Sequence, residues 1–148
     1  LLALPRDRVI AVTASAAPAI YQWLASPEAN TVGAIAEYPF VPPEEPDGYT
    51  YQLWARVHPH RVINLDYTQI GDTEERAQLA DLNRPDTLDR LRAKGVTHIL
   101  IHTEKYTQKG AKKYPLEYHG GAPIYLSPSE PGIFIEGTFG TTNVYRIQ

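Results

Sequence analysis

Four polar side chains stand at or near the ends of apolar runs in the sequence: Glu37, Asn64, Asp66 and His102. Sites of α/β proteins collect at the carboxyl ends of parallel strands, so these residues would gather along one edge of a sheet. A glutamate and a histidine in contact there could transfer protons. The alternative is that the four side chains cap helices or satisfy loop backbone.

Two pairs of histidines have spacings that raise the question of a metal site. His98 and His102 fall in a predicted strand, where four residues span about 13 Å, too far for one ion. His58 and His60 would lie about 7 Å apart on an extended segment, and paired imidazoles suit zinc or copper. A catalytic metal would need a third ligand, from Asp66 or Glu37. We favour partly solvated histidines at a turn and expect neither a metal nor another cofactor.

Other kinds of chemistry are poorly supported by the sequence. Cysteine is absent, which removes thiol catalysis and disulfides. The serines lie outside a Gly-x-Ser-x-Gly turn, and the glycines form no dinucleotide-binding motif. A net charge of −3 argues against a nucleic-acid partner. A set of aromatic residues could form a surface that stacks on sugars: Tyr38, Tyr49, Tyr51, Trp54 and Tyr67. Aromatic residues at helical spacing more often belong to the core, and we assign Trp23 and Trp54 to it.

The elements that must position these residues alternate between strand and helix. Gly95 follows a helical pattern and precedes the apolar run Val96–His102, as expected of a left-handed helix C-cap. A glycine-containing turn at Gly140-Thr141 predicts a hairpin. We predict strands over 32–38, 60–66 and 96–102, a hairpin over 133–139 and 143–147, and helices over 18–26, 51–58, 72–82 and 85–94, with a further strand conceivable over 8–12.

This order predicts an α/β fold with a mainly parallel sheet, helices on both faces in a Rossmann-like three-layer arrangement, and a C-terminal antiparallel hairpin. The 148 residues suit one domain. We assign residues 1–17 to a lead-in linker with a conceivable first strand and residues 18–148 to a single soluble α/β domain. The sequence lacks an initiator methionine, and we expect it to be a piece of a longer chain.

Three segments in order carry a resemblance to a known family. They are Ala19-Ile-Tyr-Gln-Trp-Leu-Ala25 with Gly33-Ala-Ile-Ala-Glu-Tyr-Pro-Phe40, then Tyr51-Gln-Leu-Trp-Ala-Arg-Val-His58 with Arg61-Val-Ile-Asn64, and finally 88–102. Together with the closing strand they resemble the extracytoplasmic C-terminal domain of bacterial membrane glycosyltransferases of the GT-C type, including polyprenyl-phosphate-sugar-dependent and YfhO-like proteins. The chain departs from the family's frequent Asn-Gly-Tyr, with Asn64-Leu-Asp-Tyr67 in its place.

The resemblance implies a non-catalytic domain outside the bacterial membrane, attached to a multi-spanning parent chain whose catalytic acid lies elsewhere. Its partners would be the rest of that chain and a glycan or lipid-linked sugar acceptor. By position in the motifs, the substrate-binding candidates are Glu37, Tyr51, His58, Asn64 and His102. Two rival hypotheses remain: a small free-standing hydrolase that uses a Glu or Asp with a His, and a protein-interaction module.

Overall fold

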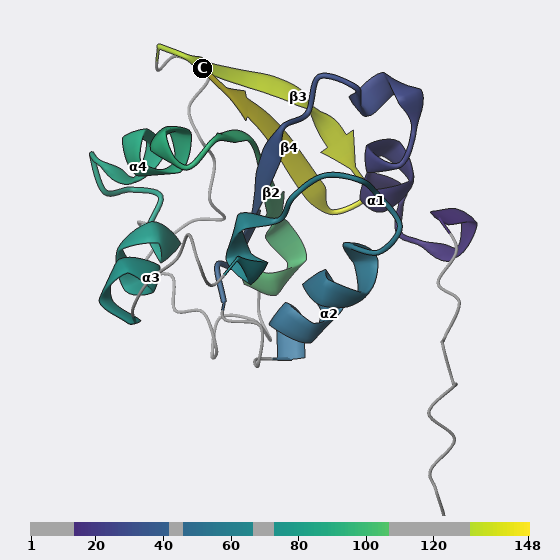
Figure 1. Cartoon of the computed structure of the whole chain (residues 1–148), viewed down its shortest axis with the longest axis horizontal. Helices are drawn as coiled ribbons and strands as arrows, with labels where there is room; N and C mark the ends of the chain where they lie inside the picture. Colours follow the sequence, from purple (N-terminus) through teal and green to yellow (C-terminus); the bar gives the residue numbers. More distant parts are fainter. Residues whose placement is uncertain (1–13, 42–45, 67–72, 107–130) are drawn as a thin grey trace, which may run out of the picture.

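A computed structural model describes residues 14–41, 46–66, 73–106 and 131–148 of the chain (Figure 1). These ranges contain four α-helices, four strands and four short 3-10 helices. The α-helices are α1 (Ala19–Leu24), α2 (Pro46–Trp54), α3 (Thr73–Ala80) and α4 (Thr87–Ala93). The strands are β1 (Ala34–Tyr38), β2 (Val96–His102), β3 (Ile133–Phe139) and β4 (Thr142–Ile147). The 3-10 helices are Ala14–Ala16, Pro27–Ala29, Ile63–Leu65 and Thr103–Tyr106.

The four strands form one mixed sheet in the order β1-β2-β4-β3. Only β1 and β2 run parallel; β2 pairs with β4, and β4 with β3, in antiparallel fashion. The prediction of a mainly parallel, Rossmann-like sheet was therefore wrong. The C-terminal hairpin forms as expected, but its second strand inserts between β2 and β3, so antiparallel pairing dominates the described sheet.

The segment predicted as a strand over 60–66 explains much of this difference. Val62 makes a single parallel bridge to Ile35 of β1, and the chain then turns into the 3-10 helix Ile63–Leu65. The Asn64 side chain accepts from the Glu37 backbone N–H at 2.8 Å and donates to the Glu37 carbonyl at 2.7 Å. Because one amide side chain occupies both backbone groups, a ladder is not needed at this edge of β1.

Apolar residues on the two faces of the sheet form two separate cores. On one face, residues such as Tyr38, Ile99 and Tyr145 pack with α3 and α4. On the other, Ile35 and Leu100 pack with α1 and the segment after α2. Figure 1 shows the helix pairs on opposite sides of the sheet. Helices therefore cover both faces, as the sequence predicts, although the sheet between them is mixed.

Boundaries of the predicted helices differ most at α2, which was placed at 51–58 but starts at Pro46 and ends at Trp54. Proline suits a helix start because its missing N–H needs no partner there. The predicted linker 1–17 and strand 8–12 fall mainly outside the described residues, as do Tyr67 and the start of the 72–82 helix. In the described ranges the longest helix has nine residues, whereas a bilayer crossing needs about 20, and no membrane span is found there.

Gly95 ends α4 with a φ of +82°, as predicted for a left-handed C-cap. We expect Gly95→Ala to lower the free energy of unfolding by about 1–2 kcal/mol, because a side chain disfavours this backbone region. Urea unfolding followed by circular dichroism measures the change. Gly137→Ala is the control: its Cβ would meet only the Phe139 ring at 3.5 Å, an ordinary contact, so stability should hold or rise slightly. Equal losses in both variants would contradict the assignment.

Candidate functional site

The carboxyl ends of β1 and β2 meet under α1 and α2, where a group of polar side chains lies in the protein interior. All five residues proposed from the sequence belong to this group, and their exposed fractions lie between 0 and 7%. They come from five different parts of the chain. They are Glu37 of β1, Tyr51 of α2, His58 after α2, Asn64 of the 3-10 helix Ile63–Leu65, and His102 of β2, and the group is completed by Tyr21 of α1 and Thr142 of β4.

Glu37 is the centre of this group and has no solvent exposure. The Tyr21 hydroxyl of α1 donates to its Oε1 atom at 2.7 Å, and Nε2 of His102 lies 3.2 Å from the same oxygen. The second oxygen, Oε2, has no hydrogen-bond partner. The Oε1 atom of Glu37 thus connects α1 to β2, while its Oε2 atom remains a hydrogen-bond acceptor without a donor.

His102 is held on three sides. Its Nδ1 atom lies 2.9 Å from the Thr142 hydroxyl, which faces it from the adjacent strand β4. The Tyr51 ring stacks on the imidazole with centroids 5.5 Å apart, and the Tyr51 hydroxyl donates to the Pro39 carbonyl at 2.9 Å. If Nε2 donates to Glu37, then Nδ1 accepts from Thr142, which fixes one tautomer of the ring.

His58 closes the group from the side of α2. Its ring lies parallel to that of Tyr21, at an angle of 3° and 6.2 Å between centroids. Nδ1 accepts from the His60 backbone N–H at 3.2 Å, while Nε2 is buried without a hydrogen-bond partner. Burial lowers the pKa of His58 below its usual value, against the opposing charge of Glu37. The ring is therefore neutral near pH 7 and serves as a packing surface for Tyr21.

Both tyrosines of the group remain protonated. Burial, followed by the negative charge of Glu37, raises the pKa of Tyr21 well above its usual value. The same two causes raise the pKa of Tyr51. Neither phenol can therefore serve as a base or nucleophile at neutral pH, and each acts as a hydrogen-bond donor.

Other residues considered from the sequence lie elsewhere. Asp66 does not join the group but lies 3.5 Å from Arg61 in an ion pair. The ring nitrogens of His60 lie 3.1 and 2.9 Å from the carbonyls of Val32 and Leu24, so they are not available to a metal. No cluster of three metal-ligating side chains occurs among the described residues. Trp23 and Trp54 are partly buried against the second core, and Tyr49 is exposed.

The arrangement contains the parts of an acid–base pair, and both Glu37 and His102 are buried. A general base must reach the proton that it removes, at about 2.6–3.2 Å or through one water. Among the residues that the structure describes, the Glu37 and His102 side chains satisfy this distance toward each other and toward Tyr21 and Thr142. These contacts hold the Glu37 backbone and the rings of Tyr51 and His102 in place.

Comparison with known proteins adds nothing to this geometry. No family model, no curated protein and no solved structure matches the chain. The site must be judged on its residues.

Two members of the group were missed from the sequence. Tyr21 could have been found, because Ala17, Ile20, Tyr21 and Leu24 are spaced as one face of a helix and all four are buried. Thr142 gives no such signal. Its position opposite His102 follows from the register of β4 on β2, which the sequence does not specify.

Asn64→Ala should destabilise the fold strongly. The substitution leaves the buried N–H and C=O of Glu37 without partners, and each unsatisfied group costs about 1–3 kcal/mol. Asn143→Ala is the matched control, because that side chain only accepts an exposed bond from Thr138. Equal midpoints for the two variants in urea unfolding would show that the Asn64 bonds are unimportant.

Acid should weaken the fold between about pH 7.5 and about pH 5.5. Burial lowers the pKa values of His58 and His98 in the folded state, so the unfolded chain binds more protons as the pH falls. The stabilisation is present above the ordinary histidine pKa and is lost below it. Urea unfolding at several pH values across this range measures how the free energy of unfolding changes with pH. That dependence should be weaker in His58→Gln. Stability that rises toward about pH 5.5 would contradict the direction of both shifts.

Proposed function

We propose that this chain is a non-catalytic, extracytoplasmic domain of a multi-spanning, glycosyltransferase-like bacterial membrane protein, where it supports the catalytic part or binds a glycan or lipid-linked sugar acceptor. One observation carries the non-catalytic part of this proposal: the five candidate residues are buried and bonded to one another and to backbone. The order of the three sequence segments supports the choice of family.

The buried group gives such a domain a firm edge. Glu37 and His102 fix the ends of β1 and β2, from which two connecting segments leave the sheet. Thr103, the first residue after β2, makes backbone and side-chain hydrogen bonds to the Thr141 carbonyl at 3.0 and 2.7 Å. Lys105 then pairs with Asp47 of α2 at 2.6 Å. These contacts hold residues 103–106, the segment after β2, and we propose that this segment faces a parent chain or acceptor.

A free-standing hydrolase is the second candidate, because Glu37 keeps one unused oxygen beside His102. That pair could move a proton if the group opened to admit a substrate. This candidate requires turnover by the chain alone, lost in His102→Ala while the fold persists. The burial of both residues favours the non-catalytic proposal.

The first test is the sequence of the native gene upstream of the codon for Leu1. We expect several apolar spans of about 20 residues, with acidic residues in the first outer loop, because a membrane parent must cross the bilayer repeatedly. An initiator codon directly upstream would refute the membrane parent and make the hydrolase the leading candidate.

A further inference from the structure

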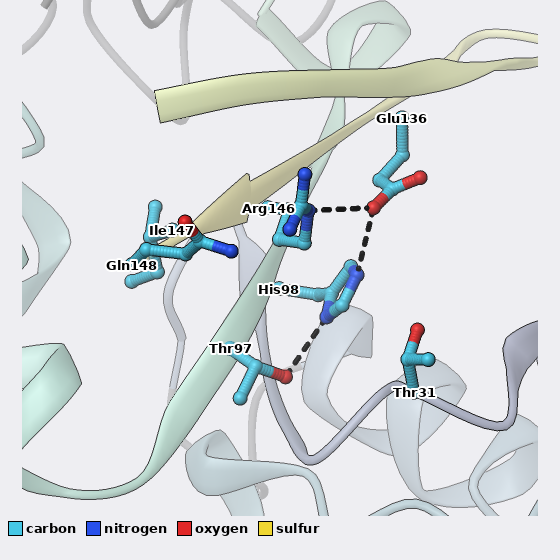
Figure 2. Close-up of a pocket in the computed structure, with 7 residues that line it drawn as sticks. All are labelled: Thr31, Thr97, His98, Glu136, Arg146, Ile147 and Gln148. Atoms are coloured by element: carbon cyan, nitrogen blue, oxygen red, sulfur yellow. Dashed lines mark hydrogen bonds and ion pairs between the residues drawn. The ribbon is translucent and has the colours of Figure 1, made fainter. Parts of the chain in front are cut away.

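A pocket of about 320 Å³ lies beside His98 (Figure 2). His98 is on the same face of β2 as His102, the partner of Glu37, but four residues away along the strand. The pocket volume is at the lower limit of small-molecule pockets, which begin near about 300 Å³. Its wall comes from the loop before β1 and from β2, β3 and β4. The lining residues are Thr31, Thr97, His98, Glu136, Arg146, Ile147 and Gln148.

His98 supplies the first polar group of the pocket, and its side chain is 1% exposed. The Thr97 hydroxyl accepts from the Gly33 backbone N–H at 2.8 Å and lies 2.8 Å from Nδ1 of His98. The Thr97 hydroxyl has two acceptors in reach, Nδ1 and, over a longer distance of 3.5 Å, the Ala34 carbonyl. If the hydroxyl donates to Nδ1, the imidazole proton is on Nε2, which has no hydrogen-bond partner and lies 3.5 Å from Glu136 Oε1 (Figure 2).

Glu136 and Arg146 supply opposite charges. Glu136 is the extra residue of a β-bulge in β3, between Ile135 and Gly137, and a bulge can redirect a side chain. Its Oε1 atom lies 3.0 Å from Nε of Arg146, whose guanidinium also lies over the Phe134 ring at 4.6 Å. Burial keeps the pKa of His98 below its usual value, so the imidazole adds no charge near pH 7. The polar wall is close to neutral overall.

We propose that this pocket binds a neutral polyhydroxyl ligand of the size of one sugar residue. A hydroxyl can donate to the partly exposed Glu136 carboxylate, and a neighbouring hydroxyl can accept from the Arg146 guanidinium, with the buried Nε2 of His98 behind them. Glu136 disfavours an anion and Arg146 disfavours a cation. Thr31 adds an exposed hydroxyl at the rim. This inference deepens the proposed function, on which it rests for the source of the sugar.

The test is a titration of ¹⁵N-labelled chain with methyl α-mannoside, methyl α-glucoside and methyl α-galactoside, followed by NMR. We expect saturable shifts of Thr31, Thr97 and His98 amides with at least one glycoside, with a Kd on the order of 1 mM. Inorganic phosphate and tetrahydropyran, a ring without hydroxyls, should cause none. Thr31→Val and Glu136→Gln should each weaken binding by about tenfold or less, and the remote Glu74→Gln should leave it unchanged.

Several results would overturn the pocket assignment. They are an absence of saturable shifts with all three glycosides, equal shifts with phosphate, or unchanged glycoside binding in both Thr31→Val and Glu136→Gln. Thr31→Val keeps the inference testable if Glu136→Gln disturbs the strand. Because the gene sequence tests the membrane parent and NMR tests the pocket, either proposal can fail while the other stands.

Discussion

The two hydrogen bonds between the Asn64 side chain and the Glu37 backbone govern the geometry of this domain. They occupy the outer edge of β1, where a further parallel strand would otherwise pair, and they leave the Glu37 side chain directed under α1. A buried backbone group without a partner is costly, and the Asn64 side chain replaces the two ladder hydrogen bonds that the N–H and C=O of Glu37 would otherwise need. Among the described strands β1 is the last at this edge, and the chain turns away into the 3-10 helix Ile63–Leu65.

A carboxyl group in the interior is costly unless donors surround it. Glu37 draws one donor from α1 and one ring nitrogen from β2, and that ring in turn depends on Thr142 of β4. The helix α1 and the strands β2 and β4 must therefore all be in their native positions before the Glu37 carboxyl oxygen has its hydrogen-bond partners. The buried group therefore links the helical layer to the centre of the sheet and gives the core a specific arrangement, which apolar packing alone specifies less sharply.

Local signals in the sequence predicted local structure well. Gly95 marked the end of α4 correctly, β2 lies where its apolar run placed it, and Glu37 and His102 do meet at one edge. The predictions that were wrong concern structure that depends on contacts between residues far apart in the sequence. Residues 60–66 have the composition of a strand, and only the pairing of Asn64 with β1 turns them into a bridge and a turn. The pocket residue Glu136 likewise depends on the register of a bulge, which no periodicity reveals.

The position of β4 also bears on how the domain forms during synthesis. β4 is the last strand of the described sheet along the chain, yet it lies between β2 and β3 and contributes Val144 and Tyr145 to the two cores. When the ribosome has released β1 and β2, the antiparallel partner of β2 has not yet emerged. The apolar edge of β2 then stays open until translation reaches β4, and this is the interval in which the nascent chain would depend most on chaperones.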